Sequence, residues 1–527
     1  MILSWACVNV VRLSRKQVIS TNGFMVLLFM VKRKFDKNQA KLGIKTLDWN
    51  VPANHISRFV VEFVEEVFPL LNIKEPKKKK GRGSLPVDSM LKLLIYAKIQ
   101  HIDRTSIIAD MARYHDIFKY VCDDIRPSER SIQRYRREYG HYFEVLLQMT
   151  LKKAFDEGFT EFNHVAIDGT IKKAYNSNNN TITKKETQIL VDYYEGRPID
   201  PESLEKLHKP AQRLLEKKDM DDEDKLELLY GIETQFTFTG QDRIPVNDIE
   251  ARFMKGKKGN YMVAYNIQSA VDYDTKLICA INVTQNPTDH YELPNIAERA
   301  IRNINTKPKY ISADTIYLNQ ISLSYLADKK IDGLIPNRKQ SKEKIGKLNP
   351  NPYHKDHFEY DYELDAFKCP EGNYLHFFAK YIEPHKDPEK PDKIKRLYNN
   401  YEACKHCPAR NKCCSSSQTH KTITEYGSEM QKAMNQKMEK QEYKDEYAKR
   451  SSVEGPFGIF KEQFQIEKEV VIGMVKTEER INLDALAYNL IRLYNIKQEI
   501  ENTTEDLEDF CESTSIKNQL KLDVTIF

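Results

Sequence analysis

Between residues 158 and 344, extended and helical patterns alternate in an order that few folds accommodate. Three apolar stretches typical of strands come first: "HVAID", "YMVAYNIQSAVDY" and "KLICAINV". A helical stretch, the strand "KYISAD", a second helical stretch and the strand "DGLIPN" follow. Antiparallel strands followed by strand and helix alternation predict a mixed sheet with helices on its faces. We therefore expect an α/β domain here.

Segments that differ in composition and in secondary-structure pattern surround and interrupt this domain. We expect an N-terminal extension (1–44), a helical domain (45–157), a first α/β part (158–344) with a charged helical insertion at about 187–245, a Cys-containing insertion (345–430) that is rich in loops, a last α/β part (431–500) and an acidic tail (501–527). A charged helical stretch at 429–450 leads into the last α/β part, which also contains a strongly apolar helix, "LDALAYNLIRLYNI".

The longest apolar stretch, "GFMVLLFMV", is too short to cross a bilayer, which takes about 20 apolar residues. We expect no membrane association. Nine cysteines, an odd number crowded late in the chain, are unlike the disulfide framework of a secreted protein. The sequence therefore predicts a cytoplasmic protein.

The helical domain contains a cationic helix, "SERSIQRYRREYG". Ser128 is a good N-cap and Gly140 a C-terminal stop. Helical spacing places three arginines on one face of it: Arg130, Arg134 and Arg137. A solvated surface helix would show the same pattern, but the nearby basic loop "KKKKGRG" favours contact with DNA phosphates.

Two aspartates follow apolar strand patterns. Asp168 ends "HVAID" and Asp314 ends "KYISAD", and a charge at the end of a buried strand is costly unless it reaches water, a partner or a metal. The two strands would lie side by side in the sheet, and Glu454, from the late helical region, would supply a third carboxylate. Taken singly, these residues would be a turn residue, a helix cap and a surface acid.

Three converging carboxylates repel each other, by about 4 kcal/mol per pair at 4 Å and an effective dielectric of 20. Such a cluster needs a cation, and hard oxygen ligands suit Mg²⁺ or Mn²⁺. Two such ions can activate a water or hydroxyl and stabilise the leaving oxygen of a phosphodiester. The acids therefore predict phosphoryl transfer on nucleic acid.

The motifs "AIDGT", "ISADT" and "YAKRSSVEGPFGIFK" resemble those of DDE insertion-sequence transposases, whose catalytic fold is RNase H-like. The last motif matches the family's Y-x2-R-x3-E-x6-K signature at Tyr447, Arg450, Glu454 and Lys461. The resemblance implies that Asp168, Asp314 and Glu454 hold two Mg²⁺ or Mn²⁺ ions. It also implies that the basic signature residues and Tyr447 contact DNA, with terminal repeats and target DNA as partners of a homo-oligomer.

The cysteines form a second group of candidate functional residues. Cys369, Cys404, Cys407 and either Cys413 or Cys414 have the chemistry of a tetrahedral zinc site, which would be structural. A loose set of reduced thiols is the alternative.

Three functions fit these patterns. The first is a DNA transposase that cleaves and joins element ends. The others are an RNase H-like nuclease without strand transfer and a DNA-binding protein whose catalytic site has decayed.

Overall fold

In a computed structural model of the chain, the described residues are 17–21, 24–28, 46–73, 84–256, 259–385, 391–450, 458 and 471–513. The chain divides into two compact units, residues 1–50 and 51–527, and each is described by itself. In the first unit, β1 (Gln17–Thr21) and β2 (Phe24–Leu28) form an antiparallel pair. The short 3-10 helix η1 (Asp48–Asn50) follows them.

The second unit begins with a group of helices. They are α1 (Ile56–Val67), η2 (Phe68–Leu71), α2 (Val87–Ile99), α3 (Thr105–Tyr114), α4 (Asp116–Val121), α5 (Glu129–Tyr139) and α6 (Tyr142–Asp156). Helix α2 is buried on nearly every side, and nine of its thirteen residues are apolar. On α5, Ser128 accepts from the backbone N–H of Ser131 and Gly140 is the C-cap, so both predicted ends are confirmed.

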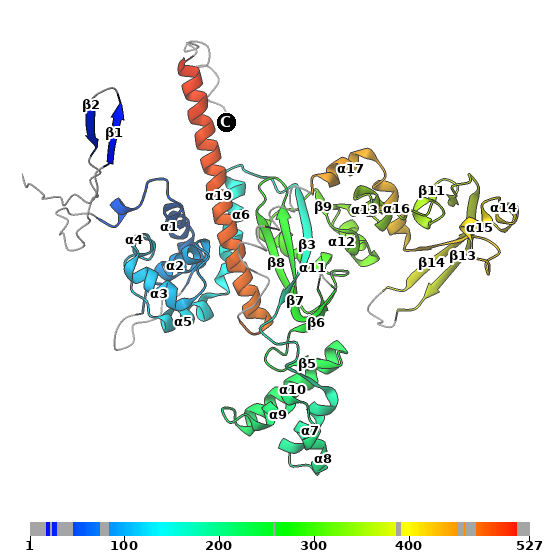
Figure 1. The fold of residues 1–527 in the computed structure, drawn as a ribbon, viewed down its shortest axis with the longest axis horizontal. Helices are drawn as coiled ribbons and strands as arrows, with labels where there is room; N and C mark the ends of the chain where they lie inside the picture. Colours follow the sequence, from blue (N-terminus) through cyan, green and yellow to red (C-terminus); the bar gives the residue numbers. More distant parts are fainter. Residues whose placement is uncertain are drawn as a thin grey trace, which may run out of the picture. The chain divides into compact units, whose positions relative to one another are not determined.

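A six-stranded mixed sheet forms the centre of this unit (Figure 1). Its strands are β3 (His164–Lys173), β6 (Arg252–Lys255), β7 (Tyr261–Asp272), β8 (Ile278–Thr284), β9 (Tyr310–Ser312) and β10 (Asp332–Leu334). They lie in the order β10-β9-β3-β7-β6, and β8 also pairs with β7. Strands β3, β7 and β8 are antiparallel, whereas β9 and β10 run parallel to β3. The predicted mixed sheet is confirmed.

Helices flank this sheet. Helix α11 (Leu293–Ile304) packs against β8, β7 and β3, α12 (Gln320–Asp328) contacts β10, and α19 (Met474–Ser513) packs against β8, α6 and α2 (Figure 1). Buried Asn489 of α19 ties its helix to two neighbours. Its Nδ2 donates to Thr150 Oγ1 and to the Ile278 carbonyl, both at 3.0 Å, and its Oδ1 accepts from the Ile278 N–H at 2.8 Å. Within the described residues, no helix is both long and apolar enough to span a membrane.

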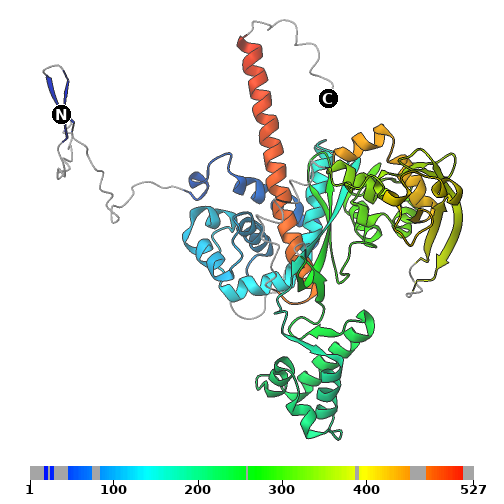
Figure 2. The same ribbon diagram turned by 45° about the vertical axis from the view of Figure 1, so that its right-hand side comes forward.

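The charged insertion forms a helical module with its own core, seen in Figure 2 as a group of green helices. They are α7 (Lys184–Tyr194), α8 (Pro201–Glu205), α9 (Lys209–Glu216) and α10 (Asp222–Thr239). The module is joined to the rest of the chain through a two-stranded ribbon, β4 (Thr181–Thr183) and β5 (Arg243–Pro245).

The Cys-containing insertion is not the loop-rich segment that the sequence predicts. It forms a five-stranded antiparallel sheet of β11 (Glu359–Asp361), β12 (Ala366–Lys368), β13 (Tyr374–Glu383), β14 (Lys393–Asn399) and β15 (Thr422–Tyr426), with short helices α14 (Tyr401–Lys405) and α15 (Arg410–Cys413). We call it the β11–β15 module. Strand β13 is exposed over most of its length, so its sequence lacks the apolar and polar alternation of a half-buried strand.

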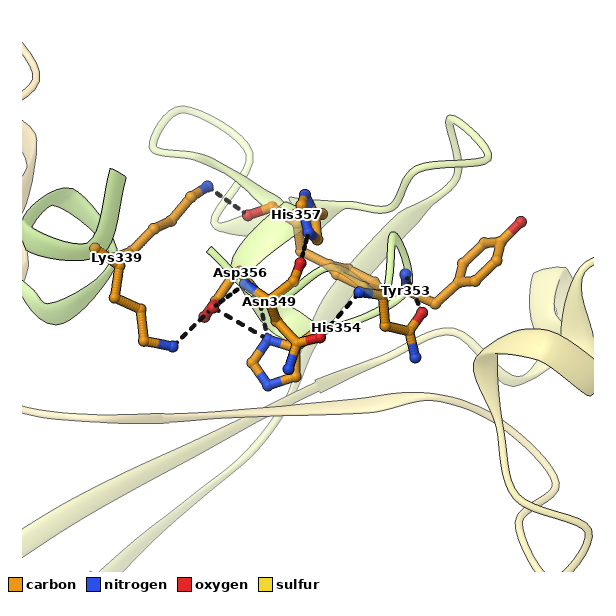
Figure 3. A network of polar contacts seen from close by, with 9 residues as sticks. Lys339, Asn349, Tyr353, His354, Asp356 and His357 are labelled. Carbon is orange, nitrogen blue, oxygen red and sulfur yellow. Dashed lines mark hydrogen bonds and ion pairs between the residues drawn. The ribbon is translucent and has the colours of Figure 1, made fainter. Parts of the chain in front are cut away.

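The chain enters this module through α13 (Arg338–Lys344) and a loop ending in η4 (Lys355–His357). Asp356 Oδ2 accepts from Lys342 Nζ at 2.7 Å, and His354 Nδ1 lies 3.3 Å from the same oxygen (Figure 3). Lys339 Nζ donates to the Phe358 carbonyl at 3.0 Å. These bonds fix the loop that carries Tyr353.

The chain leaves the β11–β15 module through α16 (Glu429–Lys437) and α17 (Gln441–Ala448). The sequence predicts one helical stretch here. The structure divides it around Met438, where α16 ends.

Candidate active site

Asp168 and Asp314 lie on neighbouring parallel strands. Ala166 of β3 is in register with Ser312 of β9, so the two aspartates, each two residues further on, lie at the same level. Asp168 does not end its strand, as the sequence suggested, because β3 continues to pair with β7 as far as Lys173. What ends before Asp168 is the fully buried part of the strand. The structure thus brings the two acids to adjacent positions.

Asp314 also acts as a cap. Its carboxylate accepts from the Thr315 N–H at 2.6 Å, at the start of η3 (Thr315–Tyr317). The interpretation of Asp314 as a helix cap is therefore correct. Asp314 remains exposed, and capping does not remove it from the neighbourhood of Asp168.

The end of α17 lies against the same face of β3. His164 and Asp168, four residues apart on the strand, share that face. Glu446 Oε1 lies 2.9 Å from His164 Nδ1, and Arg450 Nη2 lies 3.6 Å from Asp168 Oδ1. The Arg450 side chain is 11% exposed and that of Asp168 30%, so this ion pair is partly shielded from water. One residue of the predicted signature therefore contacts one of the predicted acids.

The other signature residues lie elsewhere or outside the described residues. The Tyr447 ring faces Lys344, whose Nζ lies 5.4 Å from the ring centroid. Glu454 and Lys461 fall in residues that the structure does not describe. Their predicted roles remain predictions.

Asp289 is a third acid in this neighbourhood, and sequence reasoning missed it. Its Oδ1 accepts from Asn266 Nδ2 at 2.7 Å and from Gln268 Nε2 at 2.6 Å. A Cβ at Gly169 would lie 2.7 Å from Gln268 Nε2 and still closer to the Asp289 carboxylate, so only glycine leaves room for this contact.

Burial raises the pKa of Asp289, and the charges of Asp168 and Asp314 raise it further. The two amide bonds act in the opposite direction. Asp289 is not the cap of the helix that follows it. Helix α11 begins at Leu293 with Glu292 as its N-cap and Pro294 in its first turn. A signal was present in β7, where "YNIQS" places two polar amides within a buried strand.

Tyr317 connects the two sides of this cluster. Its hydroxyl donates to Gln268 Oε1 at 2.5 Å. Burial, followed by the charges of Asp289 and Asp168, raises the pKa of Tyr317 well above its usual value, so the phenol keeps its proton. The η3 turn after Asp314 is thereby tied through Gln268 to Asp289. Among the described residues, no three His, Cys, Asp or Glu side chains converge closely enough to hold a metal ion.

Two sequence families match the chain. "Transposase DDE domain" matches residues 368–494, and "Transposase domain (DUF772)" matches residues 45–138. The chain is a DDE-type transposase. It is therefore an enzyme that cleaves DNA by phosphoryl transfer. The DDE-domain match includes Arg450 and Glu454, and it begins after Asp168 and Asp314.

A solved structure of the piggyBac transposase synaptic complex with hairpin DNA is similar over 84% of this chain and 73% of that chain, at 8% identity and a TM-score of 0.29. A likeness at this level carries no structural argument. No curated protein matches the chain.

Helix α5, except for its last residue, lies within the N-terminal match of the transposase. Its predicted cationic face is exposed, and we call the three residues the α5 arginines: Arg130, Arg134 and Arg137. Ile132 and Tyr135 on the opposite side are buried. Arg136 differs, because its Nη1 donates to the Asp103 carbonyl at 2.9 Å and burial lowers its pKa. The basic loop at 77–82 lies outside the described residues.

The transposase's late cysteines come together in the β11–β15 module. Five of them line one small cavity: Cys369, Cys404, Cys407, Cys413 and Cys414. All five are free thiols.

Proposed function

We propose that the transposase cleaves and joins the ends of an insertion sequence with a metal site made by Asp168, Asp314 and Glu454. The contact between Arg450 and Asp168 carries this proposal. Glu454 follows Arg450 by four residues, a length of chain that spans at most about 14 Å. Chain length therefore keeps Glu454 within reach of the strand acids.

The donor set fits divalent metal ions. Asp168 and Asp314 present carboxylate oxygens from adjacent strands, and hard oxygen ligands are those that Mg²⁺ and Mn²⁺ prefer. The raised pKa of Asp289 reflects, beyond its burial, the negative charge that these acids place nearby. Two bound ions would offset this charge, activate the attacking water or hydroxyl and stabilise the leaving oxygen.

The protein's own residues would position the DNA. Arg450 places a cation beside Asp168, where a scissile phosphate would bind, and Lys461 and Tyr447 would contact the same DNA end. The α5 arginines would bind the phosphate backbone of the terminal repeat through an exposed face. Because cleavage and joining involve two element ends and a target, we propose that a homo-oligomer assembles on DNA.

The strand arrangement supports an RNase H-like catalytic fold. Three antiparallel strands, β3, β7 and β8, are followed by β9 and β10, which are added parallel to β3. The proposed catalytic aspartates lie in the first of these strands and directly after the fourth.

A cleavage and joining assay tests the function. A labelled element end is incubated with the full chain and Mg²⁺ or Mn²⁺, and cut and joined products are scored. Wild type should give both products. Asp168→Ala, Asp314→Ala and Glu454→Ala should each give neither while still binding the end. Because one missing ligand disables a shared site, combining the substitutions should add little.

The matched control is Asp219→Ala, which removes an exposed acid from the helical insertion and should leave activity unchanged. Product that is cut but never joined would instead identify a nuclease. No product with any divalent ion would identify a decayed DNA-binding protein. Full activity in Asp168→Ala or Asp314→Ala would contradict the proposed site.

A further inference from the structure

The β11–β15 module has a small hydrophobic core. Its buried apolar cluster holds five residues: Phe358, Phe367, Leu375, Tyr398 and Ile423. Its longest strand, β13, is mostly exposed. Small modules that bury little apolar surface usually depend on a disulfide or a bound metal for stability. Among the described residues of this module no disulfide is formed.

The cysteines of the module come from two separate parts of the sequence. Cys369 lies in the tight turn after β12, where its N–H donates to the Asn373 carbonyl and its carbonyl accepts from the Gly372 N–H, both at 2.8 Å. Gly372 has φ +83°, a conformation that favours glycine. Cys404 and Cys407 lie at the end of α14 and just after it, and Cys413 ends α15. The fold therefore brings Cys369 close to the cysteines at 404–414.

These thiols line a small cavity of about 30 Å³. The cavity is large enough to hold a single ion. Tyr353, held by the loop in Figure 3, and Lys421 also line it.

Five thiols line this one small cavity. Thiolates so close together would repel one another, so several of them can share the space only where a cation compensates their charge, and a metal ion is such a cation.

We infer that Cys369, Cys404, Cys407 and Cys413 bind one structural zinc ion that stabilises the β11–β15 module. Four thiols at one small cavity, two of them in a C-x2-C spacing, match the donor set of the closed tetrahedral sites of structural zinc. We assign Cys413 rather than Cys414 because Cys413, like Cys369, packs against the small core.

Binding requires rotations of these side chains. Among the described residues no three metal-ligating side chains yet converge on one point, and cysteine χ1 has three staggered positions from which to reach it. On binding, four thiols release four protons to solvent and four zinc–sulfur bonds form. The net charge of the site becomes −2, which Lys421 and Arg410 at the cavity partly offset.

The test is the metal content of the full chain purified in reducing buffer, measured by mass spectrometry of the metal. We expect one zinc per chain, and Co²⁺ exchanged into the site should give the intense visible absorption of tetrahedral thiolate coordination. Cys404→Ser combined with Cys407→Ser should lose zinc and increase hydrogen exchange in β12–β14. Cys413→Ser should also lose zinc, whereas its neighbour Cys414→Ser should retain it.

Wild type provides a test that does not depend on the variants folding. A thiol-blocking mercurial should release zinc from it in proportion to the thiols modified. Reduced wild type that carries no zinc, and takes up none from added zinc sulfate, would overturn the proposal. Loss of zinc in Cys414→Ser with retention in Cys413→Ser would overturn the assignment of the fourth ligand. None of these measurements depends on DNA cleavage.

Discussion

Replacing Asn489 with alanine should destabilise the second unit strongly. Asn489 is fully buried, and it satisfies both the N–H and the C=O of Ile278 at the start of β8. It also bonds the Thr150 hydroxyl of α6. Alanine would leave the two Ile278 backbone groups without this partner in an environment that water does not reach.

Each buried backbone group that loses its partner costs about 1–3 kcal/mol. The two groups of Ile278 therefore predict a loss of about 2–6 kcal/mol in the free energy of unfolding, a large part of the 5–15 kcal/mol that is typical of a domain. Asn482 provides a matched control on the same helix. It is also buried, but its Oδ1 has no hydrogen-bond partner in the described part of the chain. Asn482→Ala should cost clearly less.

The assay is urea unfolding followed by far-UV circular dichroism. Tryptophan fluorescence is unsuitable, because both tryptophans, Trp5 and Trp49, lie within residues 1–50. Hydrogen exchange provides the local measurement, and the Ile278 amide should lose protection in Asn489→Ala alone. Equal destabilisation by Asn489→Ala and Asn482→Ala would refute this reasoning, as would an Ile278 amide whose exchange does not change.

Three further predictions follow from the structure. Alanine at all three α5 arginines should reduce the slope of log K against log salt for terminal-repeat DNA by about 2–3, because each phosphate contact contributes about 0.9; an unchanged slope would exclude these contacts. Gly169→Ala should cost about 1–3 kcal/mol by crowding Asp289, and adding Asp289→Ala should recover much of that stability; purely additive losses would contradict the contact. Burial lowers the pKa of His164, so the folded state binds a proton there less readily than the unfolded chain does. The free energy of unfolding should therefore fall as the pH drops below about 6.5. His164→Gln should lose this part of the pH dependence.

The sequence was sufficient to predict the sheet and the placement of two acids. Asp168 and Asp314 follow apolar runs that read clearly as strands, and the order of strands and helices fixes a parallel neighbour for β3. The sequence could not identify Asp289 as their neighbour. That placement depends on Asn266 and Gln268, polar residues in a buried strand whose partner lies in a loop more than 20 positions away.

The sequence could not predict the strands of the β11–β15 module or the position of α17, for different reasons. Exposure of β13 removes the alternation by which strands are recognised. The contact between His164 and Glu446 joins residues 282 positions apart, and no local pattern encodes a pairing at that distance. The cysteines differ, since their sequence pattern already grouped Cys369 with those at 404–414, and the structure places all five at one cavity.

The central claim is that Asp168, Asp314 and Glu454 share one metal site, and iron-directed cleavage tests it most directly. Fe²⁺ replaces Mg²⁺ in the full chain, and ascorbate with peroxide generates hydroxyl radicals that cut the backbone near the bound ion. We predict cuts close to all three acids, lost together in Asp168→Ala. Cuts near Asp168 and Asp314 with none near Glu454, or cuts that persist in Asp168→Ala, would contradict the shared site.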